Sequence, residues 1–175
     1  MVYHFKIYEA IPLGGCISYA DVAAKVGLSE RQVKLFLRQS ALNGIFHEPK
    51  LDQVAHTASS AVLLCDKAML DWYGHCTDEL FQASAKLADV LEKHPGSQRP
   101  EDSAFSAAFN TGEPIFKFYE KHPDRQARFF GAMEGVGRDF GHSLSHIVKG
   151  YDWAELGKGT VVDVRSTPSR FSGRF

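Results

Sequence analysis

Three histidines are the candidates for acid–base chemistry in this 175-residue chain. His142 and His146 are four residues apart, so one helix face would carry both. Two imidazoles at this spacing can bind a metal ion or share a proton. No nearby Cys, Asp or Glu completes a ligand set, and we therefore expect no metal. His75, three residues after Trp72, is the third candidate. A purely structural or surface role stays open for each histidine, so the catalytic residues are unknown at this point.

The second group that could do chemistry is aromatic. Phenylalanines are concentrated between Phe105 and Phe140, and aromatic residues at helical spacing usually pack in a core. The alternative is the wall of an apolar pocket, to which Met133 would add a polarizable thioether. The two interpretations are compatible, because a pocket wall is a core with one face left open.

The remaining sequence argues against several classes of protein. It contains no Gly-x-Ser-x-Gly, phosphate-binding loop or Cys-x-x-Cys motif. An odd number of cysteines (Cys16, Cys65 and Cys76) argues against a disulfide framework and indicates a reducing compartment. A net charge of −1 does not indicate a positively charged surface for binding nucleic acid or an anionic membrane. We see no signal peptide and no apolar run near the ~20 residues of a membrane span, and we expect a cytoplasmic protein.

The pattern of elements expected from Val2 to His56 predicts a winged helix-turn-helix. In order they are a helix Val2–Ile11, a helix begun by the capping box Ser18/Asp21 and ended by Gly27, a helix begun by the capping box Ser29/Gln32 and ended by Asn43–Gly44, and strands Ile45–His47 and Gln53–His56.

The helix after Ser29 has two possible uses. As a DNA recognition helix it would present Arg31, Lys34, Arg38 and Gln39 to phosphates or bases. As part of a packing module it would contact protein instead. Because the whole chain is nearly neutral, we favour protein packing.

The rest of the chain predicts a helical region that ends in one strand. Four glycines (Gly131, Gly135, Gly137 and Gly141) are expected to weaken or break one of its helices. The expected elements are a long helix capped by Asp66 from Lys67 towards Lys93, helices Ser103–Asn110 and Glu113–Glu120, a helix capped by Asp124 that passes Met133, helices Ser143–Val148 and Asp152–Gly157, and a strand Thr160–Val164.

Several segments, in this order, resemble the plant and fungal small-molecule O-methyltransferases: Ile17–Ser29, Ala108–Pro114, Phe116–Pro123, Phe129–Met133, Tyr151–Trp153 and Thr160–Val164. The resemblance implies an acceptor pocket whose wall includes Phe116, Phe129 and Met133, with His142 in reach of the ligand. We therefore expect the substrate-binding residues to be Trp72, Phe109, Phe116, Phe129, Met133 and His142. Family members are dimers, which implies a homodimer or a heterodimer with a related methyltransferase.

One departure from the family affects the expected function. No glycine-rich turn follows Val164, although that turn would seat S-adenosylmethionine. We expect a mainly α chain with no cofactor: a winged-helix module (1–64), a helical dimerisation and acceptor-pocket region (65–158), and a remnant strand of a lost Rossmann-like domain with a disordered tail (159–175).

Three functions follow from this organisation. The favoured one is a partner module of secondary-metabolite biosynthesis that binds a small aromatic or polyketide-like ligand without transferring methyl groups itself. The first alternative is a cofactor-independent cyclase, dehydratase or isomerase acting on a polyketide-like substrate. The second alternative is a winged-helix regulator that binds DNA.

Overall fold

The computed structural model describes residues 1–138, 140–143, 145–160 and 162. These residues are mostly helical and include one small antiparallel sheet, which confirms the predicted fold class in its coarse form. The chain divides into two compact units, Met1–Asp139 and Phe140–Phe175. Of the predicted strand, Thr160 and Val162 lie in no strand, and the other three positions and the tail fall outside the described residues. The predicted boundaries after residues 64 and 158 stay predictions.

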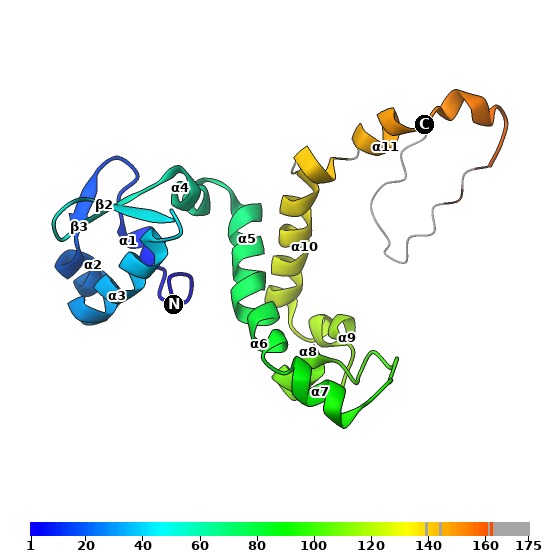
Figure 1. Cartoon of the computed structure of the whole chain (residues 1–175), viewed down its shortest axis with the longest axis horizontal. Helices are drawn as coiled ribbons and strands as arrows, with labels where there is room; N and C mark the ends of the chain where they lie inside the picture. The colour runs from blue at the N-terminus through cyan, green and yellow to red at the C-terminus, as the bar shows by residue number, and fades with distance from the viewer. Residues whose placement is uncertain (139, 144, 161, 163–175) are drawn as a thin grey trace. The chain divides into compact units, whose positions relative to one another are not determined.

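The first part of the chain combines short helices with a three-stranded sheet (Figure 1). The strand order is β1-β3-β2, with both pairs antiparallel. One hydrophobic core joins the elements, and it buries Ile7, Val22, Leu37, Phe46 and Val54. The elements are α1 (Ile7–Ala10), β1 (Cys16–Ser18), α2 (Tyr19–Val26), α3 (Glu30–Ala41), β2 (Phe46–Lys50), β3 (Gln53–His56) and α4 (Ala58–Cys65).

The predicted helix caps are present in this part. Ser29 and Gln32 form a full capping box at the start of α3. Ser18 accepts from the backbone N–H of Asp21, but the Asp21 carboxylate accepts from the Ser18 hydroxyl rather than from its backbone N–H. Gly27 ends α2 in the left-handed region, as expected of a helix C-terminus.

Three predictions for this part were wrong. The first helix is not Val2–Ile11 but only Ile7–Ala10, because Lys6 has a φ of 49°, which is incompatible with a continuous right-handed helix. Strand β1 was missed because three residues are too few for a visible alternation of polar and apolar residues. Helix α4 was missed because apolar and small residues cover it without a clear amphipathic pattern.

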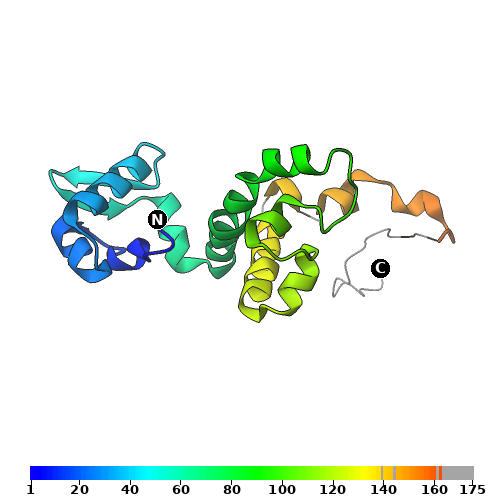
Figure 2. The ribbon, with the colours of Figure 1, turned by 90° about the horizontal axis from the view of Figure 1, so that it is seen from below.

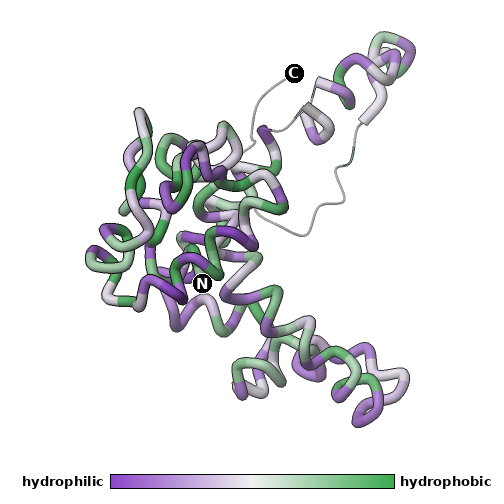
Figure 3. The backbone as a smooth tube through the Cα atoms, turned by 60° about the vertical axis from the view of Figure 1, so that its left-hand side comes forward, coloured by the Kyte–Doolittle hydropathy of each residue, from purple (hydrophilic) through white to green (hydrophobic). Residues whose placement is uncertain are grey.

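The second part of the chain is helical, with polar and apolar residues alternating along its helices (Figure 3). The predicted long helix Lys67–Lys93 is interrupted by a π turn and again at Ala85–Lys86. None of the described helices is long and apolar enough to cross a bilayer. Its elements are α5 (Lys67–His75), the π turn η1 (Cys76–Leu80), α6 (Phe81–Ser84), α7 (Leu87–Lys93), α8 (Ala104–Phe109), α9 (Ile115–Glu120) and α10 (Pro123–Arg138); the other unit contains η2 (Phe140–His142), α11 (Ser145–Gly150) and η3 (Trp153–Leu156).

Helices α5 and α10 lie side by side and form the main contact of this region (Figures 1 and 2). Glycines permit the close approach: a Cβ added to Gly135 would lie 2.9 Å from the backbone oxygen of Ala68, and one added to Gly131 would collide with the Asp71 carboxylate. The predicted break occurs after Arg138, where the 3-10 turn η2 with Gly141 follows, and not at Gly131, Gly135 or Gly137. Helix α10 is continuous from Pro123 to Arg138, and two of its glycines, Gly131 and Gly135, line the face that packs on α5.

Candidate functional site

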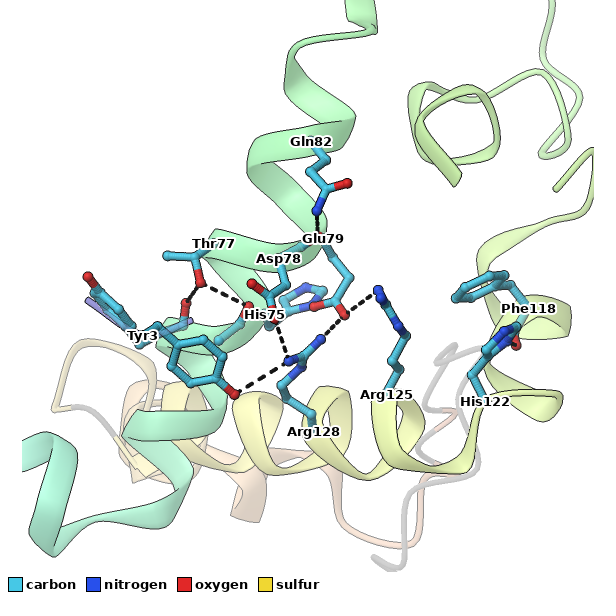
Figure 4. Close-up of polar contacts among 12 residues, drawn as sticks. Tyr3, His75, Thr77, Asp78, Glu79, Gln82, Phe118, His122, Arg125 and Arg128 are labelled. Carbon is cyan, nitrogen blue, oxygen red and sulfur yellow. Dashed lines mark hydrogen bonds and ion pairs between the residues drawn. The ribbon is translucent and has the colours of Figure 1, made fainter. Parts of the chain in front are cut away.

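A buried charged group connects the π turn η1 with helix α10. Glu79 of η1 is only 1% exposed. Its Oε1 accepts from Arg125 Nη1 at 3.1 Å and from Arg128 Nη2, while Arg128 Nη1 donates to Asp78 Oδ2 at 2.9 Å. Glu79 Oε2 lies 3.2 Å from Nδ1 of His75, which is 4% exposed. We call His75, Asp78, Glu79, Arg125 and Arg128 the Glu79 cluster (Figure 4).

Local helix geometry explains how these side chains meet. Arg125 and Arg128 are three residues apart, so they project from the same face of α10. Figure 4 shows both arginines extending from that helix towards Asp78 and Glu79. The sequence reasoning missed four of the five residues because acidic and basic side chains are usually solvent-exposed. The spacing of His75 to Glu79 and of Arg125 to Arg128 was the available signal.

The electrostatics of the Glu79 cluster favour a carboxylate at neutral pH. Burial acts to raise the pKa of Glu79, but hydrogen bonds from His75 and Arg128 and the charges of both arginines outweigh burial and lower it. Burial and the nearby Glu79 charge raise the pKa of Tyr119 to about 12. The hydroxyl of Tyr119 and Nε of Arg128 are both buried, and neither has a hydrogen-bond partner among the described residues.

A line of rings adjoins the Glu79 cluster and contains several of the predicted binding residues. The ring centroids are 6.3 Å apart for Trp72 and His75, 5.4 Å for His75 and Phe129, and 5.9 Å for Phe129 and Phe116. We call these four residues the aromatic row. Phe116 is 56% exposed, so the row reaches the surface at this end, and His75 within the row adjoins the buried Glu79.

The other predicted residues lie in different places. Phe109 packs with Phe105 and Phe118 in a second aromatic core, which Phe129 also contacts. Met133 follows Phe129 by one turn of α10 and is 40% exposed. His142 in η2 and His146 in α11 are exposed residues of the other compact unit. Their roles in binding or catalysis stay predictions.

Neither a described groove nor a metal-binding group coincides with the predicted binding residues. A groove of about 610 Å³ lies between α5 and α10, and its lining includes Cys65, Asp71, Phe130 and Arg138. None of the six predicted substrate-binding residues lines it. Within the described ranges, no three His, Cys, Asp or Glu side chains are grouped so that they could hold a metal ion.

Two cations of α3, Lys34 and Arg38, are paired with carboxylates of this chain. Arg38 donates two hydrogen bonds to Glu48, at 3.0 and 2.8 Å, and Lys34 pairs with Glu30 and Asp52. The hydrogen bonds from Arg38 lower the pKa of Glu48 to about 2. Two of the four residues considered for DNA contact are thus already paired with carboxylates.

Comparisons with known proteins identify relatives for most of the chain, although no family model matches it. O-methyltransferase bik3 of Gibberella fujikuroi is 37% identical over 161 residues, which are 92% of this chain and 36% of that protein. O-methyltransferase aurJ of Gibberella zeae is 34% identical over 164 residues, 93% of this chain and 37% of that protein. The chain thus spans little more than a third of the length of these curated relatives.

Solved structures share the fold. The crystal structure of OxaC superposes with a TM-score of 0.71 at 20% identity, covering 88% of this chain and 38% of that one. A structure described as a pericyclic reaction enzyme superposes with a TM-score of 0.62 at 19% identity, covering 79% of this chain and 35% of that one. Together with the curated relatives, these matches place the chain in the fungal O-methyltransferase family, as a homologue of the N-terminal part of its members.

Proposed function

We propose that this chain is a substrate-binding and dimerisation module of O-methyltransferase type that works in secondary-metabolite biosynthesis. The observation that supports ligand binding is the aromatic row, which leads from exposed Phe116 through Phe129 to His75, beside the buried Glu79. A row of apolar rings beside a polar cluster suits a small aromatic or polyketide-like ligand. Trp72, Phe109 and Met133 complete the proposed binding set in this unit.

The proposed module includes a winged helix used for protein packing. Helices α2 and α3 and the antiparallel pair β2–β3 would form it, and pairing of Lys34 and Arg38 with carboxylates supports packing over DNA contact. In this proposal the winged helix spans residues 1–64 and the helical region residues 65–158. The protein would work in the cytoplasm without nucleic acid or membrane.

Exposed apolar side chains support pairing with a second copy or with a related methyltransferase. Phe81 on α6 and Leu91 on α7 are large and exposed, and a partner would remove their apolar surface from water. Light scattering of the chain, alone and co-expressed with a related methyltransferase, tests this proposal. Phe81→Ser and Leu91→Ser should each reduce association. A monomer under both conditions would contradict it.

We expect no methyl transfer by residues 1–175 themselves, because no glycine-rich turn follows the sequence Thr160–Val164. Calorimetric titration with S-adenosylmethionine tests this, with a full-length related methyltransferase as the positive control. Binding in the micromolar range would refute this part of the proposal.

A cofactor-independent enzyme is the second candidate. The observation that favours it is the buried His75–Glu79 pair beside the aromatic row, because a histidine held by a carboxylate can move protons. The structural likeness to a pericyclic reaction enzyme supports the fold alone. Incubation with a polyketide-like pathway intermediate tests it: His75→Ala should lower turnover, and His47→Ala, at an exposed residue of the wing, should not.

A further inference from the structure

We propose that Glu79 positions His75 for a bound ligand: the carboxylate fixes the imidazole proton on Nδ1 and leaves Nε2 to accept a hydrogen bond from a hydroxyl group of that ligand. This inference rests on the proposed ligand-binding role of the aromatic row. It assigns Glu79, Arg125 and Arg128 to the support of that site.

The geometry determines which histidine nitrogen carries the proton. Glu79 Oε2 lies 3.2 Å from His75 Nδ1, and both side chains are almost fully buried. An ionised carboxylate can only accept hydrogen bonds, so Nδ1 must be the donor. In a neutral imidazole the other nitrogen is then an acceptor. Nε2 makes no hydrogen bond with the described residues.

The charges of the Glu79 cluster balance one another without a contribution from His75. Arg125 and Arg128 supply two positive charges, and Asp78 and Glu79 supply two negative charges. The two arginines also occupy Glu79 Oε1, so that only Oε2 faces the histidine.

A second observation indicates that a polar group from outside the chain belongs here. The Tyr119 side chain is 1% exposed, and its hydroxyl has no partner among the described residues. Buried polar groups nearly always have a partner. The Tyr119 ring lies 5.2 Å from that of Phe129, which also contacts His75. Two polar side chains therefore adjoin the same ring of the aromatic row, and an oxygen-bearing ligand would serve both.

The first experiment measures the tautomer of His75 by ¹⁵N–¹H NMR in the 175-residue chain at neutral pH. We expect the pattern of a neutral ring protonated on Nδ1. Glu79→Gln should reverse it, because the arginines would hold the amide oxygen and turn the NH₂ group towards Nδ1, which must then accept. Asp78→Asn, the matched control that removes the same charge but does not contact His75, should leave the tautomer unchanged.

Three results would overturn the inference: a wild-type ring protonated on Nε2, a wild-type imidazolium, or a Glu79→Gln variant that keeps the proton on Nδ1. If Glu79→Gln does not fold, as circular dichroism would show, the wild-type and Asp78→Asn spectra still decide the matter.

The second experiment compares two probes, 2-naphthol and naphthalene, by calorimetry. The hydroxyl should make 2-naphthol bind the wild-type chain about three- to tenfold more tightly, the usual net value of one hydrogen bond. Glu79→Gln should abolish this preference without weakening naphthalene binding. Equal binding of both probes to wild type would refute the inference and leave the proposed function intact. Binding of neither would count against the proposed function, while the NMR pattern still tests Glu79.

Discussion

The close contact between α5 and α10 predicts that Gly135→Ala destabilises the fold, and Gly137 on the same helix provides the control. Gly135→Ala would place a Cβ 2.9 Å from the backbone oxygen and 3.1 Å from the carbonyl carbon of Ala68. Backbone atoms cannot move aside as a side-chain tip can, so the helices must separate, and overpacking of this kind costs about 1–3 kcal/mol. Alanine also gains up to about 1 kcal/mol over glycine in helix propensity. The net loss for Gly135→Ala is then about 0–2 kcal/mol.

Gly137→Ala isolates the propensity term, because a Cβ at Gly137 meets nothing within 4 Å. This variant should gain up to about 1 kcal/mol, less if the last turn of α10 is frayed. Urea unfolding followed by circular dichroism should separate the two variants by about 1–3 kcal/mol, or several degrees in Tm. Equal stabilisation by both substitutions would refute the argument that Gly135 is required for helix contact.

Three further predictions concern caps and charges. Ser29→Ala should cost about 1 kcal/mol in urea unfolding, because it removes the capping box of α3. Arg128→Met should lower the free energy of unfolding by about 3 kcal/mol. This is the low end for a broken buried ion pair, because Arg125 still binds Glu79. A loss below about 1 kcal/mol would contradict the buried pairing. The pKa of Glu48 is about 2 in the folded chain, compared with its ordinary value of 4.5. The stability that the Glu48 carboxylate gives the fold is therefore complete above pH 4.5 and lost as the pH falls towards 2. Glu48→Gln should flatten this part of the pH–stability curve.

The sequence predicted the fold well wherever the signal was local. The capping box at Ser29 and the left-handed Gly27 depend on side chains within a few residues of a helix end, and both predictions were confirmed. The glycines of α10 were misread because their function depends on α5, which is far away in sequence. By helix propensity alone, a glycine is expected to destabilise a helix. Its role in close helix packing becomes visible only when the neighbouring helix is known.

Apart from His75, the candidate site was predictable only in its apolar part. Aromatic residues at Phe116 and Phe129 stood out by composition, and the structure places both in the aromatic row. The Glu79 cluster did not stand out, because 46 residues separate Glu79 from Arg125. Glu79 is buried only because a distant segment packs on it, so neither segment shows a sequence pattern that predicts this burial.

The π turn η1 has a consequence for how this stretch of chain can vary. A π turn is wider by one residue than the α-helical turn it replaces, and one residue corresponds to a rotation of about 100° around the helix axis. Deleting one residue from Cys76–Leu80 would leave α5 on α10 but would rotate α6, turning Ala83 away from the rings of the second aromatic core. The number of residues between Cys76 and Leu80 therefore determines which face of α6 packs against the second aromatic core.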